Sequence, residues 1–224
     1  PLVVKVYGGS MLSSRMNRFG LEAGIDNLHL LSTRGYGVLL PDAPLREGTP
    51  LEDLAAAVLP GIDSAIALGL ADPERLAVMG HSYGGYSVLA LLVQTDRFKA
   101  AVSSGGFGNL FTQYGLLRDD GSAIGVRMLE RVPGRMGGHP WELRDRYIAN
   151  SPYFVFDRVE TPVLLMHGGA DRTVPVAAAD ETFVALRRLG KTVEYARYDG
   201  EEHHPGSWSI SDATDYWLRN FGWL

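Results

Sequence analysis

The sequence contains no cysteine. Disulfide bonds, thiolate metal sites and a cysteine nucleophile are therefore excluded, although this absence does not identify a cellular compartment. Positive charge is also scarce, since 21 Lys and Arg residues stand against 26 Asp and Glu residues and give a formal net charge of −5. A dedicated nucleic-acid-binding domain normally carries a basic face, so that class is disfavoured. No apolar run approaches the roughly 20 residues that span a bilayer, so no membrane span is expected.

The length and the rest of the composition are those of an ordinary globular domain. The chain has 224 residues, of which 46% are hydrophobic and 21% are charged. A chain of this length buries roughly 70% of the surface that it exposes when unfolded, which is enough for a core of its own. It begins with Pro1 inside an apolar strand pattern, without a methionine or a signal-peptide pattern. We therefore expect a fragment of a longer polypeptide. The compartment stays open, with the cytoplasm slightly favoured.

Short apolar runs alternate with helical patterns along most of the chain. Strands are predicted at residues 2–7, 36–40, 75–79, 100–103, 162–167 and 192–198. Helices are predicted at residues 17–33, 50–70, 84–94, 141–150, 177–189 and 210–220, with Thr49 as the N-cap of the second one. Residues 107–135 fit this alternation poorly, and we expect them to form an excursion over one edge of the sheet.

The alternation predicts the class of fold. Strands that are apolar throughout and separated by helices are typical of a parallel sheet that is covered on both faces. The sequence therefore predicts an α/β fold with a doubly wound sheet. In such a sheet, functional groups gather at the carboxyl ends of the strands.

A short motif lies between the third predicted strand and the helix that follows it. Gly80-His81-Ser82-Tyr83-Gly84 matches the pattern G-x-S-x-G. Between a strand and a helix, this pattern forms a turn too tight for side chains at its flanks, and the turn lifts the serine hydroxyl above the sheet beside the helix N-terminus. The alternative is a strand-to-helix turn in which glycine is only sterically useful. The position of the motif and the partners downstream favour Ser82 as a nucleophile.

A nucleophilic serine needs a base, and the base needs a carboxylate that orients it. Asp171 follows the strand at 162–167 and therefore lies at the same edge of the sheet as the serine. Its alternative role is a turn residue that caps the next helix. His203 and His204 follow the strand at 192–198, and the residues alone do not decide between them. Two adjacent histidines without a third ligand are a weak sign of a metal site, so no metal is expected.

Several longer motifs resemble the catalytic domain of the prolyl oligopeptidase family of serine peptidases. They are Tyr7-Gly8-Gly9, the elbow G-x-S-Y-G-G-Y at 80–86, Arg135-Met136-Gly137-Gly138 with Pro140-Trp141-Glu142 and Ser151-Pro152, H-G-x-x-D-x-x-V-P at 167–175, and Gly200-Glu201-Glu202-His203. Glu202 stands where the family motif G-E-G-H has glycine, and Ser10 stands where proline or phenylalanine is common. Neither departure touches the expected catalytic residues.

The resemblance implies an α/β-hydrolase fold over residues 1–224, with a mostly parallel sheet and helices on both faces. It implies an N-terminal β-propeller in the same polypeptide, which restricts entry to short peptides, and it allows an oligomer. It also implies that Ser82 is the nucleophile, that His203 rather than His204 is the base, and that Asp171 orients the base. This activity involves no cofactor, metal, nucleic acid or membrane.

Acyl transfer also needs two donors for the oxyanion. The backbone N–H of Tyr83 is one, because the residue after the nucleophile points into the turn. By resemblance to the tyrosine-bearing branches of the family, the hydroxyl of Tyr7 is the second. The alternative is that Tyr7 only packs at a strand end and that a backbone N–H of the Gly8-Gly9-Ser10 turn donates instead.

The substrate is the least determined feature of the sequence. Phe107, Phe111, Tyr114 and Val174 are candidates for an apolar P1 pocket, although each is equally well explained as ordinary core. The favoured function is a serine peptidase that hydrolyses short peptides through an acyl-enzyme. The alternatives are a carboxylesterase or another small-molecule acyl hydrolase with the same triad, and a binding module on the same scaffold, which the intact triad disfavours.

Overall fold

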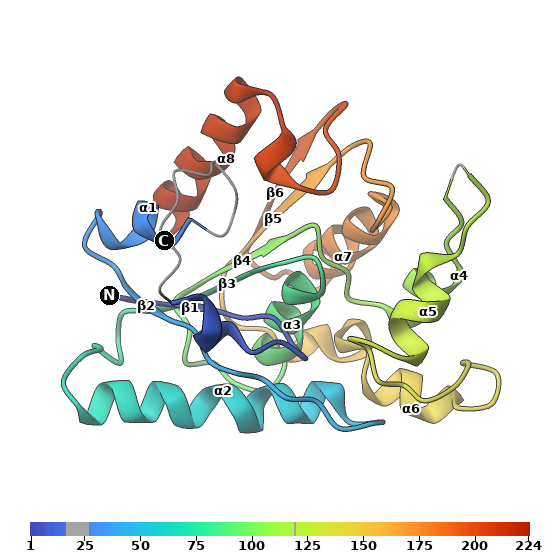
Figure 1. Cartoon of the computed structure of the whole chain (residues 1–224), viewed down its shortest axis with the longest axis horizontal. Helices are drawn as coiled ribbons and strands as arrows, with labels where there is room; N and C mark the ends of the chain where they lie inside the picture. Colours follow the sequence, from blue (N-terminus) through green and yellow to red (C-terminus); the bar gives the residue numbers. More distant parts are fainter. Residues whose placement is uncertain (17–26, 119) are drawn as a thin grey trace.

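The computed structural model describes residues 1–16, 27–118 and 120–224. Within them, six strands form a single sheet in the order β2-β1-β3-β4-β5-β6, and every neighbouring pair is parallel (Figure 1). The strands are β1 (Leu2–Lys5), β2 (Gly37–Leu39), β3 (Leu76–His81), β4 (Ala100–Ser104), β5 (Val163–Gly168) and β6 (Val193–Tyr198). The predicted α/β-hydrolase fold with its parallel sheet is confirmed.

Helices cover both faces of the sheet (Figure 1). They are α1 (Leu28–Ser32), α2 (Pro50–Ala67), α3 (Tyr83–Leu92), α4 (Leu110–Gly115), α5 (Ile124–Glu130), α6 (Arg144–Ala149), α7 (Ala177–Arg188) and α8 (Ile210–Trp223). Three short 3₁₀ helices are η1 (Leu12–Arg15), η2 (Pro152–Arg158) and η3 (Pro205–Ser207). No helix among the described residues has the length and apolar character needed to cross a membrane.

The core consists of two apolar layers, one on each face of the sheet. Because successive strand residues point to opposite faces, Val4 joins the layer of α2, α3 and α7, whereas Val3 joins the layer of α1 and α8. All residues of β1, β3, β4 and β5 are buried, as expected for strands with helices on both sides. This packing fixes the central strands, whose carboxyl ends carry the site described below.

Some predicted element bounds differ from the structure. Of the helix predicted at 17–33, residues 28–32 are helical and residues 17–26 lie outside the described residues. Thr49 is the N-cap of α2, but its hydroxyl bonds the Asp53 carboxylate at 3.2 Å and makes no capping bond. Asp53 also binds the Arg46 side chain and its backbone N–H, so this carboxylate anchors the start of α2 in place of the predicted cap. The helix predicted from 141 begins at Arg144, and β3 continues to His81.

Residues 107–118 and 120–135 contain α4 and α5 and interrupt the alternation of strands and helices, as predicted. The segment leaves the sheet after the carboxyl end of β4 and lies beside α6, beyond the strand ends (Figure 1). It is tied to α7 by a bond from Asn109 Nδ2 to Glu181 Oε1 (2.9 Å) and to the segment after α6 by one from Leu110 N to Ser151 Oγ (3.1 Å). The excursion therefore borders the end of the sheet that carries the functional groups, rather than covering an outer strand.

Candidate active site

Ser82 occupies a strained turn between the last residue of β3 and the first residue of α3. Its φ of 61° and ψ of −126° are rare for a residue with a side chain, and such strain persists where the surroundings enforce it. A Cβ on Gly80 would overlap the carbonyl of Gly84, and a Cβ on Gly84 would lie 2.5 Å from Val6 O. Both glycines are therefore required by the close approach of backbone to backbone, which explains the G-x-S-x-G pattern.

The structure brings the three residues predicted for the triad into one chain of hydrogen bonds. His203 Nε2 lies 2.9 Å from Ser82 Oγ, and His203 Nδ1 lies 2.6 Å from Asp171 Oδ2. The three residues follow the carboxyl ends of β3, β5 and β6, as the fold requires. His203 and Asp171 are buried, whereas His204 is exposed and packs its ring 4.9 Å from that of His203. The contacts with Ser82 and Asp171 are both made by His203.

The carboxylate of Asp171 is fully hydrogen-bonded. Its Oδ1 accepts from the N–H groups of Thr173 (2.8 Å) and Val174 (2.9 Å), and its Oδ2 lies near nitrogens of His203 and His167. Burial alone would raise the pKa of Asp171, but the hydrogen bonds and charges of His167 and His203 outweigh it and hold the pKa well below its usual range. Asp171 is therefore ionised at neutral pH, as an orienting carboxylate must be.

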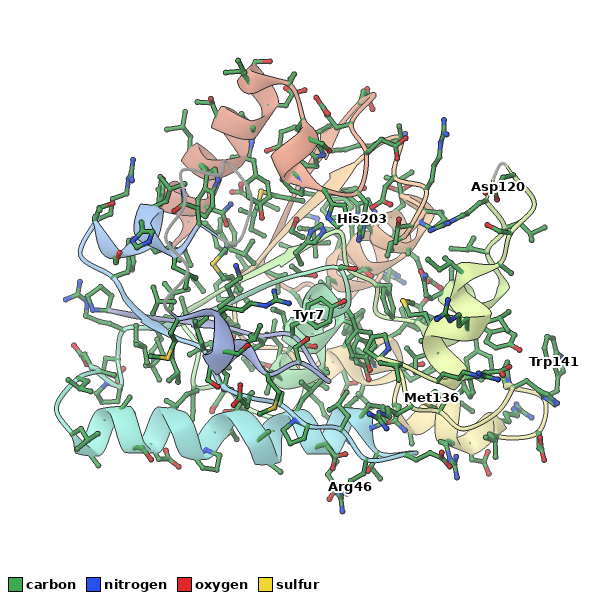
Figure 2. The ribbon with its side chains drawn as sticks, in the orientation of Figure 1. Tyr7, Arg46, Asp120, Met136, Trp141 and His203 are labelled. Atoms are coloured by element: carbon green, nitrogen blue, oxygen red, sulfur yellow. The ribbon has the colours of Figure 1, made fainter. Side chains whose placement is uncertain are left out.

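Tyr7 lies next to the serine, at the end of the chain segment that follows β1, and Figure 2 shows it among the central strands. Burial raises the pKa of the Tyr7 phenol, and a hydrogen bond with the Ser82 side chain offsets this only in part. The phenol therefore keeps its proton at neutral pH and can donate it. The position of Tyr7 is fixed by hydrogen bonds of the next residue, because Gly8 N–H donates to Ser87 Oγ (3.0 Å) and that hydroxyl donates to Tyr83 O (2.7 Å).

The backbone donors considered as an alternative to Tyr7 are all engaged. Gly8 N–H donates to Ser87, Gly9 N–H donates to Ala43 O (2.7 Å), and Ser10 N–H donates to Tyr7 O (3.2 Å). The Tyr83 N–H, in contrast, belongs to the first residue of α3, where backbone N–H groups have no acceptor within the helix. The two predicted donors, the Tyr7 hydroxyl and the Tyr83 N–H, are therefore not replaced by the backbone of the Gly8-Gly9-Ser10 turn.

His81, the variable residue of the elbow motif, was not predicted to take part in the site. Its buried ring lies 4.6 Å from that of His203 and 5.7 Å from that of His204, and its Nδ1 lies 3.2 Å from Ser104 Oγ. Burial, followed by repulsion from His203 and His204, holds the pKa of His81 well below its usual value. His81 is therefore a neutral ring packed against the base. The motif gives its place in the chain, but only the fold shows that β3 and the loop after β6 meet there.

The four residues proposed for the pocket separate into two pairs. Phe107 and Val174 have no exposed surface, and the Phe107 ring packs in the core 5.5 Å from that of Tyr86. Phe111 and Tyr114 instead line an apolar hollow of about 360 Å³, which we call the aromatic hollow. Its lining residues are Phe111, Tyr114, Gly115, Pro140, Trp141 and Arg144. The P1 role of the four side chains stays a prediction.

Trp141 lines the aromatic hollow but was not among the residues predicted for the pocket. It is 81% exposed, and its ring meets that of Tyr114 edge to face at 5.7 Å. Figure 2 shows Trp141 at the right-hand margin of the molecule, well apart from Tyr7 and His203. The exposed Trp141 ring extends the apolar surface of the hollow. Among the described residues, no group of three or more His, Cys, Asp or Glu side chains could hold a metal ion.

A sequence profile described as the prolyl oligopeptidase family matches residues 48–221. The chain belongs to the prolyl oligopeptidase family. This confirms the resemblance found in the motifs. An uncharacterized peptidase of Bacillus subtilis is 29% identical over 217 residues, which cover 91% of this chain and 31% of that protein.

Solved structures agree with this assignment. An acylaminoacyl peptidase in complex with Z-Gly-Gly-Phe-chloromethyl ketone superimposes with a TM-score of 0.78 at 25% identity, over 99% of this chain and 36% of that one. The chain thus spans about a third of the length of these peptidases. A relative from Methylorubrum extorquens carries the provisional name carboxymethylenebutenolidase, and it is 26% identical over 92% of this chain and 68% of its own length.

Proposed function

We propose that the chain is the catalytic domain of a serine peptidase that hydrolyses short peptides through an acyl-enzyme. The observation that carries the proposal is the unbroken hydrogen-bond chain from Ser82 through His203 to Asp171, with contacts of 2.9 and 2.6 Å. Both contacts are within the reach that general-base catalysis requires. Membership in a peptidase family supports the same activity.

Acylation follows from the placement of the protons. Ser82 Oγ attacks the carbonyl carbon of the substrate while its proton passes to His203 Nε2. The imidazolium that forms keeps its Nδ1–H on Asp171, whose negative charge stabilises it. His203 Nε2 then returns the proton to the leaving amine, and the C–N bond breaks. In the second half of the cycle, His203 takes a proton from water, and the water oxygen attacks the acyl-enzyme. His203 then returns this proton to Ser82 Oγ as the C–O bond breaks and the acid leaves.

The oxyanion that develops in both steps is proposed to bind the Tyr7 hydroxyl and the Tyr83 N–H. The Tyr7 hydroxyl already bonds the Ser82 side chain in the resting site, so a short movement brings it to an oxygen on the attacked carbon. The Tyr83 N–H adds the positive end of the α3 dipole. The occupied N–H groups of Gly8, Gly9 and Ser10 support this pair.

The aromatic hollow is proposed to bind an apolar side chain of the substrate. Its separation from Tyr7 and His203 in Figure 2 favours a substrate residue away from the cleaved bond. Phe111 and Tyr114, predicted for the P1 pocket, are therefore proposed to bind that more distant residue. A β-propeller in the same polypeptide is proposed as a partner domain, which agrees with a chain that spans a third of its peptidase relatives. An oligomer is compatible with this arrangement.

A small-molecule acyl hydrolase is the second candidate. It is favoured by the Methylorubrum extorquens relative, which is not named as a peptidase and matches this chain over most of its own length. The triad serves both activities equally, because ester and amide hydrolysis pass through the same acyl-enzyme.

Labelling and substrate comparison test both candidates. We expect a fluorophosphonate to label the protein covalently, and Ser82→Ala to remove the label while leaving the unfolding temperature close to that of the parent. Retained labelling of the alanine variant would overturn the assignment of the nucleophile. Turnover of aminoacyl amides at rates near those of the matching esters supports the peptidase. Hydrolysis of simple esters alone favours the second candidate.

A further inference from the structure

A second histidine shares the carboxylate of the triad. His167 is the last residue but one of β5, and its Nε2 lies 3.2 Å from Asp171 Oδ2, the same oxygen that His203 Nδ1 approaches at 2.6 Å. The side chains of His167 and Asp171 are 1% and 0% exposed. Neither solvent nor substrate reaches the His167 ring, so it acts through Asp171 or not at all.

The surroundings fix which nitrogen of His167 carries the proton. Its Nε2 lies 2.7 Å from Val174 O, and a carbonyl oxygen can only accept, so Nε2 must be protonated. The Nε2–H group is then shared between Val174 O and Asp171 Oδ2. Val174 N–H in turn donates to Asp171 Oδ1 (2.9 Å), which closes a ring of contacts around the carboxylate. The Nδ1 atom is buried and has no partner among the described residues.

We propose that His167 is a positioning residue of the triad, which holds Asp171 Oδ2 in line with His203 Nδ1 and draws off part of the carboxylate charge. The proposal rests on the proposed serine-hydrolase function. Two N–H donors compete for one oxygen, so the charge that stabilises the His203 imidazolium depends on both of them. His167 therefore sets the orientation of the base through Asp171 and also the strength of the Asp171–His203 contact.

The proposal has a signature that a purely structural role lacks. Loss of the His167 donor frees only Asp171 Oδ2, which slows the reaction. The N–H groups of Thr173 and Val174 still hold Oδ1, so the carboxylate stays beside His203 and leaves more negative charge for the imidazolium. The acidic limb of the pH–rate profile, which reports protonation of His203, then moves to higher pH. A displaced carboxylate would move it to lower pH, because the imidazolium would lose its partner. His81, His204 and Ser82 also face His203, and Tyr7 lies beyond the serine. These residues are the same in the His167 variants and the parent, so a shift of the limb reports the change at His167.

Three variants separate these outcomes. His167→Gln keeps an N–H donor at about the reach of Nε2, His167→Leu removes the donor at similar volume, and His167→Asn is polar but too short to reach Val174 O and Asp171. The readout is the second-order rate constant of fluorophosphonate labelling across pH, which needs no natural substrate. The His167→Leu and His167→Asn variants are expected to lower this rate constant roughly 10-fold to 100-fold, the range for a hydrogen bond to a charged group. They are also expected to move the acidic limb of the profile to higher pH. The His167→Gln variant is expected to keep both the rate constant and the acidic limb close to those of the parent.

Wild-type rates and an unmoved limb in His167→Leu would overturn the proposal, and so would a limb that moves to lower pH. Where the Leu and Asn variants fail to fold, ¹⁵N chemical shifts of His167 in the unaltered protein decide: protonated Nε2 with bare Nδ1 supports the proposal, and the opposite tautomer overturns it. If the unaltered protein is not labelled at all, the proposed function has failed, whereas the tautomer still reports on His167 independently.

Discussion

The nucleophile elbow and the aromatic hollow are built in opposite ways. The elbow is five consecutive residues, Gly80–Gly84, fixed by backbone contacts in front of α3, a helix in which every residue is buried. The hollow is assembled from two separate segments, residues 111–115 and residues 140–144, and one of its rings, Trp141, is 81% exposed. The elbow thus depends on rigid local backbone, and the hollow depends on side chains carried by loops and short helices.

This difference has a functional consequence. We expect changes in the lining of the hollow to alter substrate binding without touching the hydrogen bonds of the triad, because Ser82, His203 and Asp171 are not among the lining residues. Loops held by a rigid scaffold commonly carry specificity in this way. We therefore expect substitutions in the elbow and its partners to affect kcat, and substitutions in the hollow to affect KM.

The largest effect is expected at the base. His203→Ala should lower kcat on the order of 10⁶-fold, since loss of the base costs about as much as loss of the whole triad. His204→Ala removes an exposed ring that only packs against His203 and His81, so most of the activity should remain. Steady-state kinetics on an activated ester measures both variants. The reverse ranking would assign the base to His204.

Tyr7→Phe is expected to have the next largest effect. The ring and its packing stay, but the donor to the oxyanion is lost, which is typically worth roughly 10²-fold to 10³-fold in kcat. KM should change little, because this bond strengthens only in the transition state. Tyr114→Phe, which removes a hydroxyl bonded to Glu130 Oε1 at 2.8 Å in the hollow region, is the matched control and should leave kcat unchanged. Full kcat for Tyr7→Phe on an amide substrate would reduce Tyr7 to a packing residue.

The same contrast explains what the sequence could predict. The elbow, Asp171 and the class of fold follow from short motifs and from apolar runs, because each is a local backbone requirement. His203 could be separated from His204 only through the family resemblance, since adjacent residues share every positional argument. The roles of His81 and His167 depend on three loops meeting at the end of the sheet, and no spacing along the chain encodes that meeting.

The hollow shows where prediction from sequence ends. Phe107 and Phe111 are four residues apart and equally apolar, yet Phe107 is fully buried and Phe111 lines the hollow. Which of them faces outward depends on how α4 packs against its neighbours, and α4 contains only six residues. Periodicity over such a short helix is too weak to orient it. The sequence contains Trp141 in a family motif, but it does not predict that the Trp141 side chain is exposed.

Trp141→Ala tests the binding surface. We expect KM for a longer peptide with an aromatic side chain to rise up to about 10-fold, the value of one aromatic contact, with kcat unchanged. A short aminoacyl amide, which does not reach the hollow, should be unaffected. Ile210→Ala is a matched control, because Ile210 is 88% exposed and lies on α8. Equal KM values for Trp141→Ala and its parent on the longer peptide would remove the hollow from the substrate path.

The smallest expected effect is a pH dependence of the free energy of unfolding, which should arise in the elbow and not in the hollow. Burial and the neighbouring histidines hold the pKa of folded His81 well below the value of about 6.5 in the unfolded chain. Below about pH 6.5, His81 is protonated in the unfolded chain but stays neutral in the folded protein. This contribution to stability is therefore present above about pH 6.5 and is lost as the pH falls. From about pH 7.5 down to about pH 5.5, the His81 contribution should therefore lower the free energy of unfolding.

His81→Phe keeps a buried ring beside His203 but cannot titrate, so this part of the pH dependence should disappear. Chemical denaturation at the two pH values measures the free energy of unfolding of each variant. Trp141→Ala serves as the control from the hollow, because it changes no ionisable group and should keep the pH dependence of its parent. If His81→Phe also keeps that dependence, then His81 accepts a proton in the folded protein, and the neutral ring described beside the base would be wrong. A lost dependence in His81→Phe alone would place this pH sensitivity in the elbow, the region that also carries the chemistry.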